Sequence, residues 1–183
     1  AKGWQTIEGR RYYFHTSTCQ LQRGFFQVGK AWYYYNEDRT VKTGWWNREE
    51  TGARYYFNGN GQAVTGWQTI GGSRYYFDAN GVMQTQRTKI GNVYYFFGPD
   101  GKMRTGFVKY CDTTYYFNGN GQMLKGWQTI GGQRYYFDAE GALQIGFVKV
   151  GTATYYFDER QATLGRLLKG LQNIGEETYY FNT

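Results

Sequence analysis

The chain has 183 residues and a net charge of +7, and its composition differs from that of an ordinary aliphatic core. Leucine, isoleucine, valine and phenylalanine together number 34, which with this charge would be typical of a disordered protein. The 20 tyrosines, 6 tryptophans and 13 phenylalanines argue against disorder, because disordered chains carry few aromatic residues. No apolar run approaches the roughly 20 residues that a membrane-spanning helix needs.

A Tyr-Tyr pair recurs along the whole chain at intervals of 19 to 24 residues, which predicts an array of small structural repeats. Each repeat starts several residues before its pair, near residues 3, 24, 44, 66, 86, 106, 126, 146 and 170. We interpret residues 1–183 as a single repeat module. Because the chain starts inside a repeat and has no signal peptide, we expect it to be a piece of a longer protein.

The repeat that begins at Gly66 is predicted to form a β-hairpin. Trp67 to Ile70 and Ser73 to Phe77 are rich in strand-favouring residues, and Gly71-Gly72 between them suits a tight turn with positive φ. Pairing outward from this turn places Ile70 opposite Ser73 and Trp67 opposite Tyr76. One face then carries Trp67, Thr69, Arg74 and Tyr76, and the other carries Gln68, Ile70, Ser73, Tyr75 and Phe77.

Each hairpin is followed by a turn such as Asp78–Gly81 and by a buried-type residue two positions after the glycine. An isolated hairpin is marginally stable in water, so we expect each one to bury its aromatic side chains against the next. The predicted fold is therefore all-β, a β-solenoid of about nine repeated β-hairpins.

Two copies and one connector depart in length from this pattern. The third has two extra residues around Arg48 to Thr51, and the fifth is predicted to be one residue short around Gly91-Asn92, with Val93 before its Tyr-Tyr pair. The connector from Asp158 to Lys169 is longer than the others and is predicted to form a helical turn or a terminal cap.

The pattern Gly-Trp-Gln-Thr-Ile-x-Gly-x-x-Tyr-Tyr-Phe-Asp-x-x-Gly, as at Gly66 and Gly126, resembles the cell-wall-binding repeat superfamily of Gram-positive bacteria. This superfamily includes choline-binding modules, the glucan-binding domains of glucansucrases and the repeats of clostridial toxins. The resemblance implies a secreted or cell-surface protein whose ligand sites lie between adjacent hairpins.

Choline-binding repeats hold the ligand's quaternary ammonium group between the tryptophan of Gly-Trp and a second tryptophan before Tyr-Tyr, by cation–π attraction. In this chain no repeat has tryptophan at both positions, although Trp32 offers one partial site. Repeats with an intact Gly-Trp place an arginine at the second position, which would repel a cation: Arg11, Arg54, Arg74 and Arg134. These arginines could equally be a solvated face stacked over tryptophan, or a stripe for an anionic polymer such as teichoic acid.

Similarity to the glucan-binding branch implies sugar sites made from a glutamine, a polar residue after the turn and a tyrosine. The predicted carbohydrate-binding residues are Gln5, Arg10 and Tyr12; Gln68, Ser73 and Tyr75; and Gln128, Gln133 and Tyr135. Secondary aromatic or basic candidates are Trp4, Trp32, Trp67, Arg74, Trp127 and Arg134. The glutamines could alternatively serve only to satisfy a hairpin edge.

The sequence therefore predicts a non-catalytic module that binds extracellular polysaccharide, most simply an α-glucan, through several weak sites. The alternatives are anchoring to the cell envelope through choline or teichoic acid, and binding of host glycans as in toxin repeats. No catalytic triad, metal-ligand cluster or cofactor motif is present, and we expect no nucleic-acid partner and no membrane insertion. Cys19 and Cys111 occupy non-equivalent positions, and we interpret them as unpaired.

Overall fold

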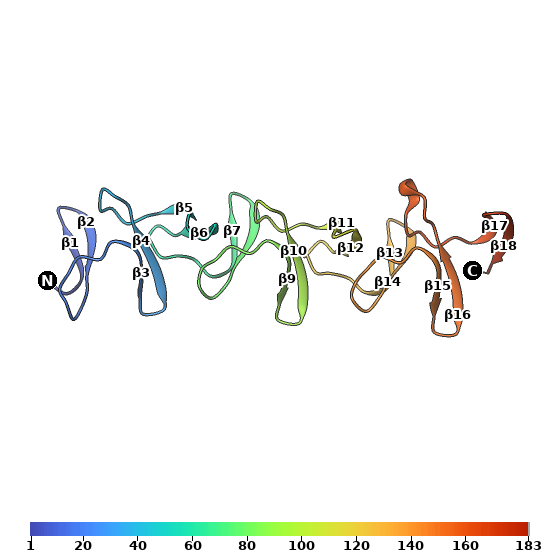
Figure 1. The fold of residues 1–183 in the computed structure, drawn as a ribbon, viewed down its shortest axis with the longest axis horizontal. Coiled ribbons are helices and arrows are strands. Elements are labelled where there is room, and N and C mark those ends of the chain that lie inside the picture. The colour runs from blue at the N-terminus through green and yellow to red at the C-terminus, as the bar shows by residue number, and fades with distance from the viewer. Residues whose placement is uncertain (183) are drawn as a thin grey trace. The chain divides into compact units, whose positions relative to one another are not determined.

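The computed structural model describes residues 1–182, which form nine two-stranded sheets and one short 3-10 helix (Figure 1). The predicted all-β class with repeated hairpins is confirmed. The first hairpins are β1 (Gly3–Ile7) with β2 (Arg10–Phe14), β3 (Gly24–Val28) with β4 (Ala31–Tyr35), β5 (Gly44–Arg48) with β6 (Ala53–Phe57), and β7 (Gly66–Ile70) with β8 (Ser73–Phe77). They are followed by β9 (Gln86–Ile90) with β10 (Val93–Phe97), β11 (Gly106–Tyr110) with β12 (Thr113–Phe117), β13 (Gly126–Ile130) with β14 (Gln133–Phe137), β15 (Gly146–Val150) with β16 (Ala153–Phe157), and β17 (Gly170–Ile174) with β18 (Glu177–Phe181).

The chain divides into two compact units, which are described separately. The first unit comprises Ala1–Gln86 with Phe97–Met103, and the second comprises Arg87–Phe96 with the chain from Arg104 onward. Both are built in the same way, from hairpins joined by short connectors.

The strand register agrees with the sequence prediction. In the fourth hairpin Ile70 pairs with Ser73 and Trp67 pairs with Tyr76, and Gly71 and Gly72 have φ of 55° and 75°. A two-residue loop with positive φ at both positions matches the twist of the flanking strands, which is why glycine is favoured there. The two faces of each hairpin are therefore those expected from the sequence.

The core is a series of phenylalanines, each at the end of the second strand of a hairpin. Phe77 has no exposed surface and bridges to Met83 in the following connector. The amide of Met83 also donates to the carbonyl of Arg54 in the preceding hairpin, at 2.8 Å. In the second unit Leu143 makes the same bond to Thr114. Connectors with this bond join their own hairpin to the one before it.

Successive connectors also pack directly against one another. Gly101, at φ +78°, lies so close to Met83 that a Cβ at this position would be 2.2 Å from the Met83 Sδ. Glycine is required here both for the backbone conformation and for the close contact.

The fifth hairpin corrects one sequence prediction, because it is not shortened. Strands β9 and β10 have five residues each, and Phe97, which is fully buried and bridges to Met103, occupies the place of Phe77. The Tyr-Tyr pair is instead displaced by one residue, so Tyr94, and not Val93, stands at the position of Arg74.

The other irregular segments are as predicted. The third hairpin has a four-residue turn from Glu49 to Gly52, and the long connector contains the 3-10 helix η1 (Gln161–Thr163). Cys19 and Cys111 are exposed free thiols. Across the described residues, no helix has the length and apolar character needed to span a membrane.

Candidate binding sites between hairpins

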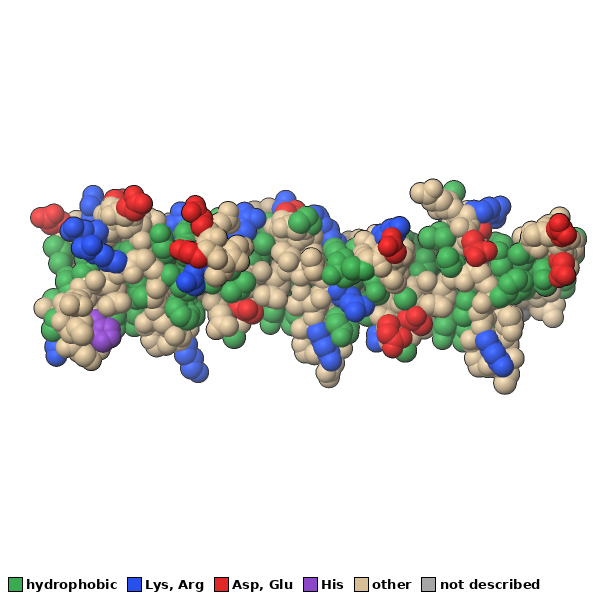
Figure 2. All heavy atoms as spheres, in the orientation of Figure 1, with side chains coloured by type: hydrophobic (Ala, Val, Ile, Leu, Met, Phe, Trp, Pro, Cys, Tyr) green, Lys and Arg blue, Asp and Glu red, His purple; other side chains and the backbone are tan. Residues whose placement is uncertain are grey.

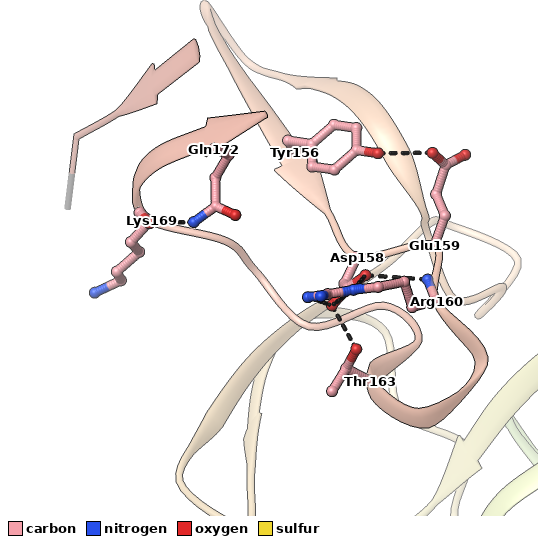
Figure 3. Close-up of polar contacts among 7 residues, drawn as sticks. All are labelled: Tyr156, Asp158, Glu159, Arg160, Thr163, Lys169 and Gln172. Atoms are coloured by element: carbon pink, nitrogen blue, oxygen red, sulfur yellow. Dashed lines mark hydrogen bonds and ion pairs between the residues drawn. The ribbon is translucent and has the colours of Figure 1, made fainter. Parts of the chain in front are cut away.

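The glutamines predicted to bind sugar share one hydrogen bond to the backbone. The side-chain amide nitrogen of Gln68 donates to the carbonyl of Thr65 at 2.8 Å, and Gln5 and Gln128 make the equivalent bonds at 2.9 and 2.7 Å. Gln172 repeats the bond to Lys169 at 2.8 Å (Figure 3). Each glutamine therefore fixes the chain where it enters the first strand, and its amide oxygen remains for a ligand.

Two of the three tyrosines in the predicted sites are almost completely buried, and so offer little surface to a ligand. Tyr75 and Tyr135 are each 6% exposed, whereas Tyr12 is partly exposed. The rings of Tyr75 and Tyr135 each contact an aromatic residue of the preceding hairpin. The ring centroids are 5.1 Å apart for Tyr75 and Trp45 and 5.2 Å apart for Tyr135 and Phe107. The face with glutamine and tyrosine thus packs toward the preceding hairpin.

The polar residues after the turn are more accessible. Arg10 and Gln133 are exposed, and Ser73 is partly exposed. They border the same face as the glutamine and the tyrosine of their own hairpin. Together with the amide oxygens, they are the parts of the predicted sites that solvent can reach.

The tryptophan and arginine candidates lie on the opposite face. Trp127 contacts Tyr155 of the following hairpin at 4.8 Å, and Trp4 contacts Tyr33 of its following hairpin at the same distance. We call the contact between two successive hairpins of one unit a seam. The two groups of candidates predicted on one hairpin therefore belong to two different seams.

Each arginine candidate covers a tryptophan of its own hairpin. The guanidinium carbon of Arg74 lies 4.4 Å from the centre of the Trp67 ring, and that of Arg134 lies 4.3 Å from Trp127. The same stack joins Arg11 to Trp4 and Arg54 to Trp45, both at 4.4 Å. Since a cation already occupies these rings, a second cation would be repelled from them.

The fifth hairpin keeps this pairing with the partners exchanged. Arg87 stands at the tryptophan position and Tyr94 at the arginine position, and the guanidinium carbon lies 5.2 Å from the centre of the Tyr94 ring. The second hairpin replaces the cation by a ring, because Trp32 stacks on Phe25 at 4.6 Å with an interplanar angle of 3°. In both arrangements an aromatic ring is covered by a side chain of its own hairpin.

Two seams of the second unit have no such cover. The tryptophan position holds Phe107 and Phe147, which are 46% and 49% exposed, and the arginine position holds Thr114 and Thr154. Both phenylalanines still contact the first tyrosine of the next hairpin, Tyr135 at 5.2 Å and Tyr179 at 5.1 Å. Neither phenylalanine is among the predicted site residues, although a threonine at the arginine position is the signal in the sequence that marks both.

Basic side chains form no continuous stripe on the face seen in Figure 2. In each unit they are interspersed with acidic side chains and with exposed apolar ones. This face therefore presents no uniform array of positive charge.

Aromatic hairpins whose seams expose ring faces and polar groups define a binding module of the repeat type. The chain belongs to the choline-binding repeat family, whose model matches residues 1–39, 64–96, 85–125 and 124–161. A model of a putative cell wall binding repeat matches residues 46–63.

Similar proteins include Toxin A of Clostridium novyi, which is 38% identical over 78 residues, covering 38% of this chain and 4% of the toxin. Glucosyltransferase-S of Streptococcus mutans is 34% identical over 71 residues, covering 38% of this chain and 5% of the enzyme. The chain thus matches only a small part of these relatives. Choline binding protein F of Streptococcus pneumoniae has a similar structure, with a TM-score of 0.75 and 30% identity over 92% of this chain and 58% of that one.

Proposed function

We propose that this chain is a non-catalytic carbohydrate-binding module that binds an α-glucan through several weak sites between adjacent hairpins of a β-solenoid. The observation that carries the proposal is the half-exposed rings of Phe107 and Phe147, each beside a tyrosine of the next hairpin. A flat aromatic face suits the apolar side of a pyranose ring, and neighbouring polar groups suit its hydroxyls. The similarity to Glucosyltransferase-S supports a glucan as the ligand.

The residues predicted from the sequence keep a part in this proposal. The amide oxygens of Gln5, Gln68 and Gln128 would accept hydrogen bonds from sugar hydroxyls. The exposed polar groups of Arg10, Ser73 and Gln133 would add further contacts, beside Tyr12, Tyr75 and Tyr135.

Single sites of this kind bind weakly, because few contacts offset the entropy lost on binding. Several sites on one chain that face one polymer raise the overall affinity by roughly 10²–10⁴ when the geometry permits. We infer that the protein is secreted or held at the cell surface, where such polymers are found.

Choline binding is the second candidate, and family membership favours it. Against it, four tryptophans are covered by arginines of their own hairpins, and the parallel stack of Trp32 on Phe25 leaves no gap for a ligand between the rings. Teichoic acid and host glycans are weaker candidates, the latter supported by the similarity to Toxin A.

Affinity electrophoresis in a gel containing dextran, set beside retention on choline-agarose, tests the proposal. We expect retardation by dextran that persists at high salt, because contacts to a neutral sugar are not screened. Retention on choline-agarose without retardation by dextran would contradict the glucan proposal. Retention on an anionic polymer that is lost at high salt would indicate teichoic acid instead.

A further inference from the structure

The connector between β16 and β17 has four more residues than the regular turn, and it closes with the same hydrogen bonds. In the regular turn the amide of Gly81 donates to the carbonyl of Asp78 at 3.0 Å, and the amide of Asp78 donates to Val82 at 2.9 Å. In the long connector Gly165 donates to Asp158 at 2.7 Å and Asp158 donates to Arg166 at 2.8 Å. Residues 159–164 thus take the place of the two central residues of the regular turn. The closing hydrogen bonds form without the four additional residues in the regular turn, so these residues are not required to close it.

The inserted residues are held by a buried carboxylate. Asp158 is 2% exposed and accepts hydrogen bonds from Arg160, whose Nη2 lies 2.6 Å away, and from the hydroxyl of Thr163 (Figure 3). The hydroxyl of Tyr156 donates to Glu159 at 2.7 Å. These bonds fix the position of the 3-10 helix η1.

The fixed insertion forms one wall of a cavity at the seam between the sixth and seventh hairpins. The cavity has a volume of about 310 Å³, and its opposite wall is formed by Phe107, Thr114 and Tyr135. Leu143, Gln161 and Arg166 complete the lining that matters for a ligand. This volume lies at the lower end of the roughly 300–1,000 Å³ typical of ligand pockets.

The lining combines one exposed ring with donors and acceptors of hydrogen bonds. Phe107 offers an aromatic face, Thr114 a hydroxyl, Gln161 an amide and Arg166 a guanidinium. Arg166 brings a positive charge to the lining and none of the described lining residues is acidic, so a cationic ligand would be repelled. A ring with hydroxyl groups and an apolar face matches these groups.

We propose that this cavity is a binding site for one pyranose unit of a neutral polysaccharide, and that the wall formed by the insertion makes this seam bind more tightly than a seam without it. The inference rests on the proposed glucan binding and assigns it to a particular seam. The seam between the eighth and ninth hairpins has the same pair of residue types, Phe147 and Thr154, without the wall formed by the insertion.

Two variants test the site in the full chain by affinity electrophoresis in dextran. In the first, Glu159 to Leu164 is replaced by Ala-Asn, which restores the regular Asp-Ala-Asn-Gly turn and its closing hydrogen bonds. The second is Phe107→Ala. We expect each variant to raise the apparent dissociation constant for dextran by about tenfold, whereas Leu171→Ala, which removes an exposed apolar side chain at the same position of the ninth hairpin, leaves it unchanged. Gln161→Ala, at an exposed position, provides a milder variant should either of the others fail to fold.

The outcomes separate this inference from the proposed function. Wild-type binding to dextran that is unaffected by the short turn, Phe107→Ala and Gln161→Ala would overturn the assigned site and leave the proposed function standing. No retardation of the wild type by dextran would overturn both. Binding to polygalacturonate in place of dextran, lost in the same variants, would overturn the neutral ligand class.

Discussion

The guanidinium carbon of Arg134 lies 4.3 Å from the centre of the Trp127 ring, on the face of the hairpin that packs toward the next one. At the equivalent place in the sixth and eighth hairpins, threonine leaves a phenylalanine half exposed. The residue at this one position therefore determines whether a seam presents an aromatic face to solvent.

Replacement of Arg134 by threonine should uncover Trp127. We expect a loss of about 0.5–1 kcal/mol in the free energy of unfolding, which is the usual strength of an exposed cation–π contact. The uncovered indole should also become accessible to acrylamide, measured as increased quenching of tryptophan fluorescence. Lys149→Thr removes an exposed positive charge that covers no tryptophan, and it should change neither quantity. Equal quenching of Arg134→Thr and the wild type would show that the stack does not shield the ring in solution.

The double variant Gln68→Ala with Gln128→Ala tests the glutamines as sugar ligands. Each substitution removes a side-chain bond to the backbone, at 2.8 and 2.7 Å, and should lower stability by about 0.5–1.5 kcal/mol. If the amide oxygens also bind sugar, dextran should retard the double variant less than the wild type, by more than the smaller fraction of folded protein accounts for. Gln144→Ala is the control, because its amide bonds to Asp138 and Ala142 within a connector. Unchanged retardation in the folded double variant would restrict these glutamines to a structural role.

Much of the hairpin geometry could be predicted, because it depends on local chemistry. The turn glycines and the alternation of side chains were sufficient to set Ile70 opposite Ser73 and to assign the two faces. The fifth hairpin was misjudged because Val93-Tyr94-Tyr95-Phe96-Phe97 has four consecutive aromatic residues, so the Tyr-Tyr pair fits two registers. The burial of Phe97 and its bridge to Met103 distinguish them.

The arrangement of the sites could not be read from a single repeat. A hairpin has two faces, and each contributes to a different seam, so residues that are adjacent in one repeat, such as Trp127 and Gln128, do not face the same neighbour. The cavity beside Phe107 also depends on an insertion more than fifty residues later in the chain, at Gln161. Contacts of such long sequence separation leave no local pattern.

Gly101→Ala should be strongly destabilising. The added Cβ would lie 2.2 Å from the Met83 Sδ, and alanine is also strained at φ +78°. We expect a loss of about 2–4 kcal/mol in the free energy of unfolding, from overpacking together with backbone strain. Thermal unfolding measures the change.

Gly72→Ala separates the two contributions. Its φ is +75°, but no atom lies within 4 Å of the position of the added Cβ, so only the backbone penalty of about 1–2 kcal/mol should remain. Combining Gly101→Ala with Met83→Ala should recover part of the contact penalty, because at the equivalent Gly81, which faces Ala63, an added Cβ would lie 3.1 Å from its nearest neighbour and not 2.2 Å. Equal effects of the two single substitutions would mean that the contact with Met83 is relieved by movement of its flexible side chain.

The buried carboxylate of Asp158 should make the insertion sensitive to acid. Hydrogen bonds from Arg160, opposed in part by burial, hold the pKa of Asp158 well below its ordinary value of about 3.9. Because this pKa is lower in the folded than in the unfolded state, ionised Asp158 stabilises the folded insertion fully above a pH of about 4. This stabilisation is lost as the pH falls toward and below the pKa of Asp158 in the folded protein. Hydrogen exchange of the amides of residues 159–165 should therefore accelerate, relative to the regular turn at Asp78, as the pH is lowered from about 5 to about 2.

Asp158→Asn is the informative variant, because asparagine occupies the same turn position in Asn58 and Asn118 and accepts the turn amides there. This variant should keep the turn and lose the ion pair with Arg160. The amides of the insertion should then be less protected from hydrogen exchange at neutral pH, and their protection should no longer change between pH values of about 5 and 2. Protection that depends on pH equally in both proteins would assign the acid sensitivity to another carboxylate, for which Glu159, bonded to Tyr156, is the nearest candidate.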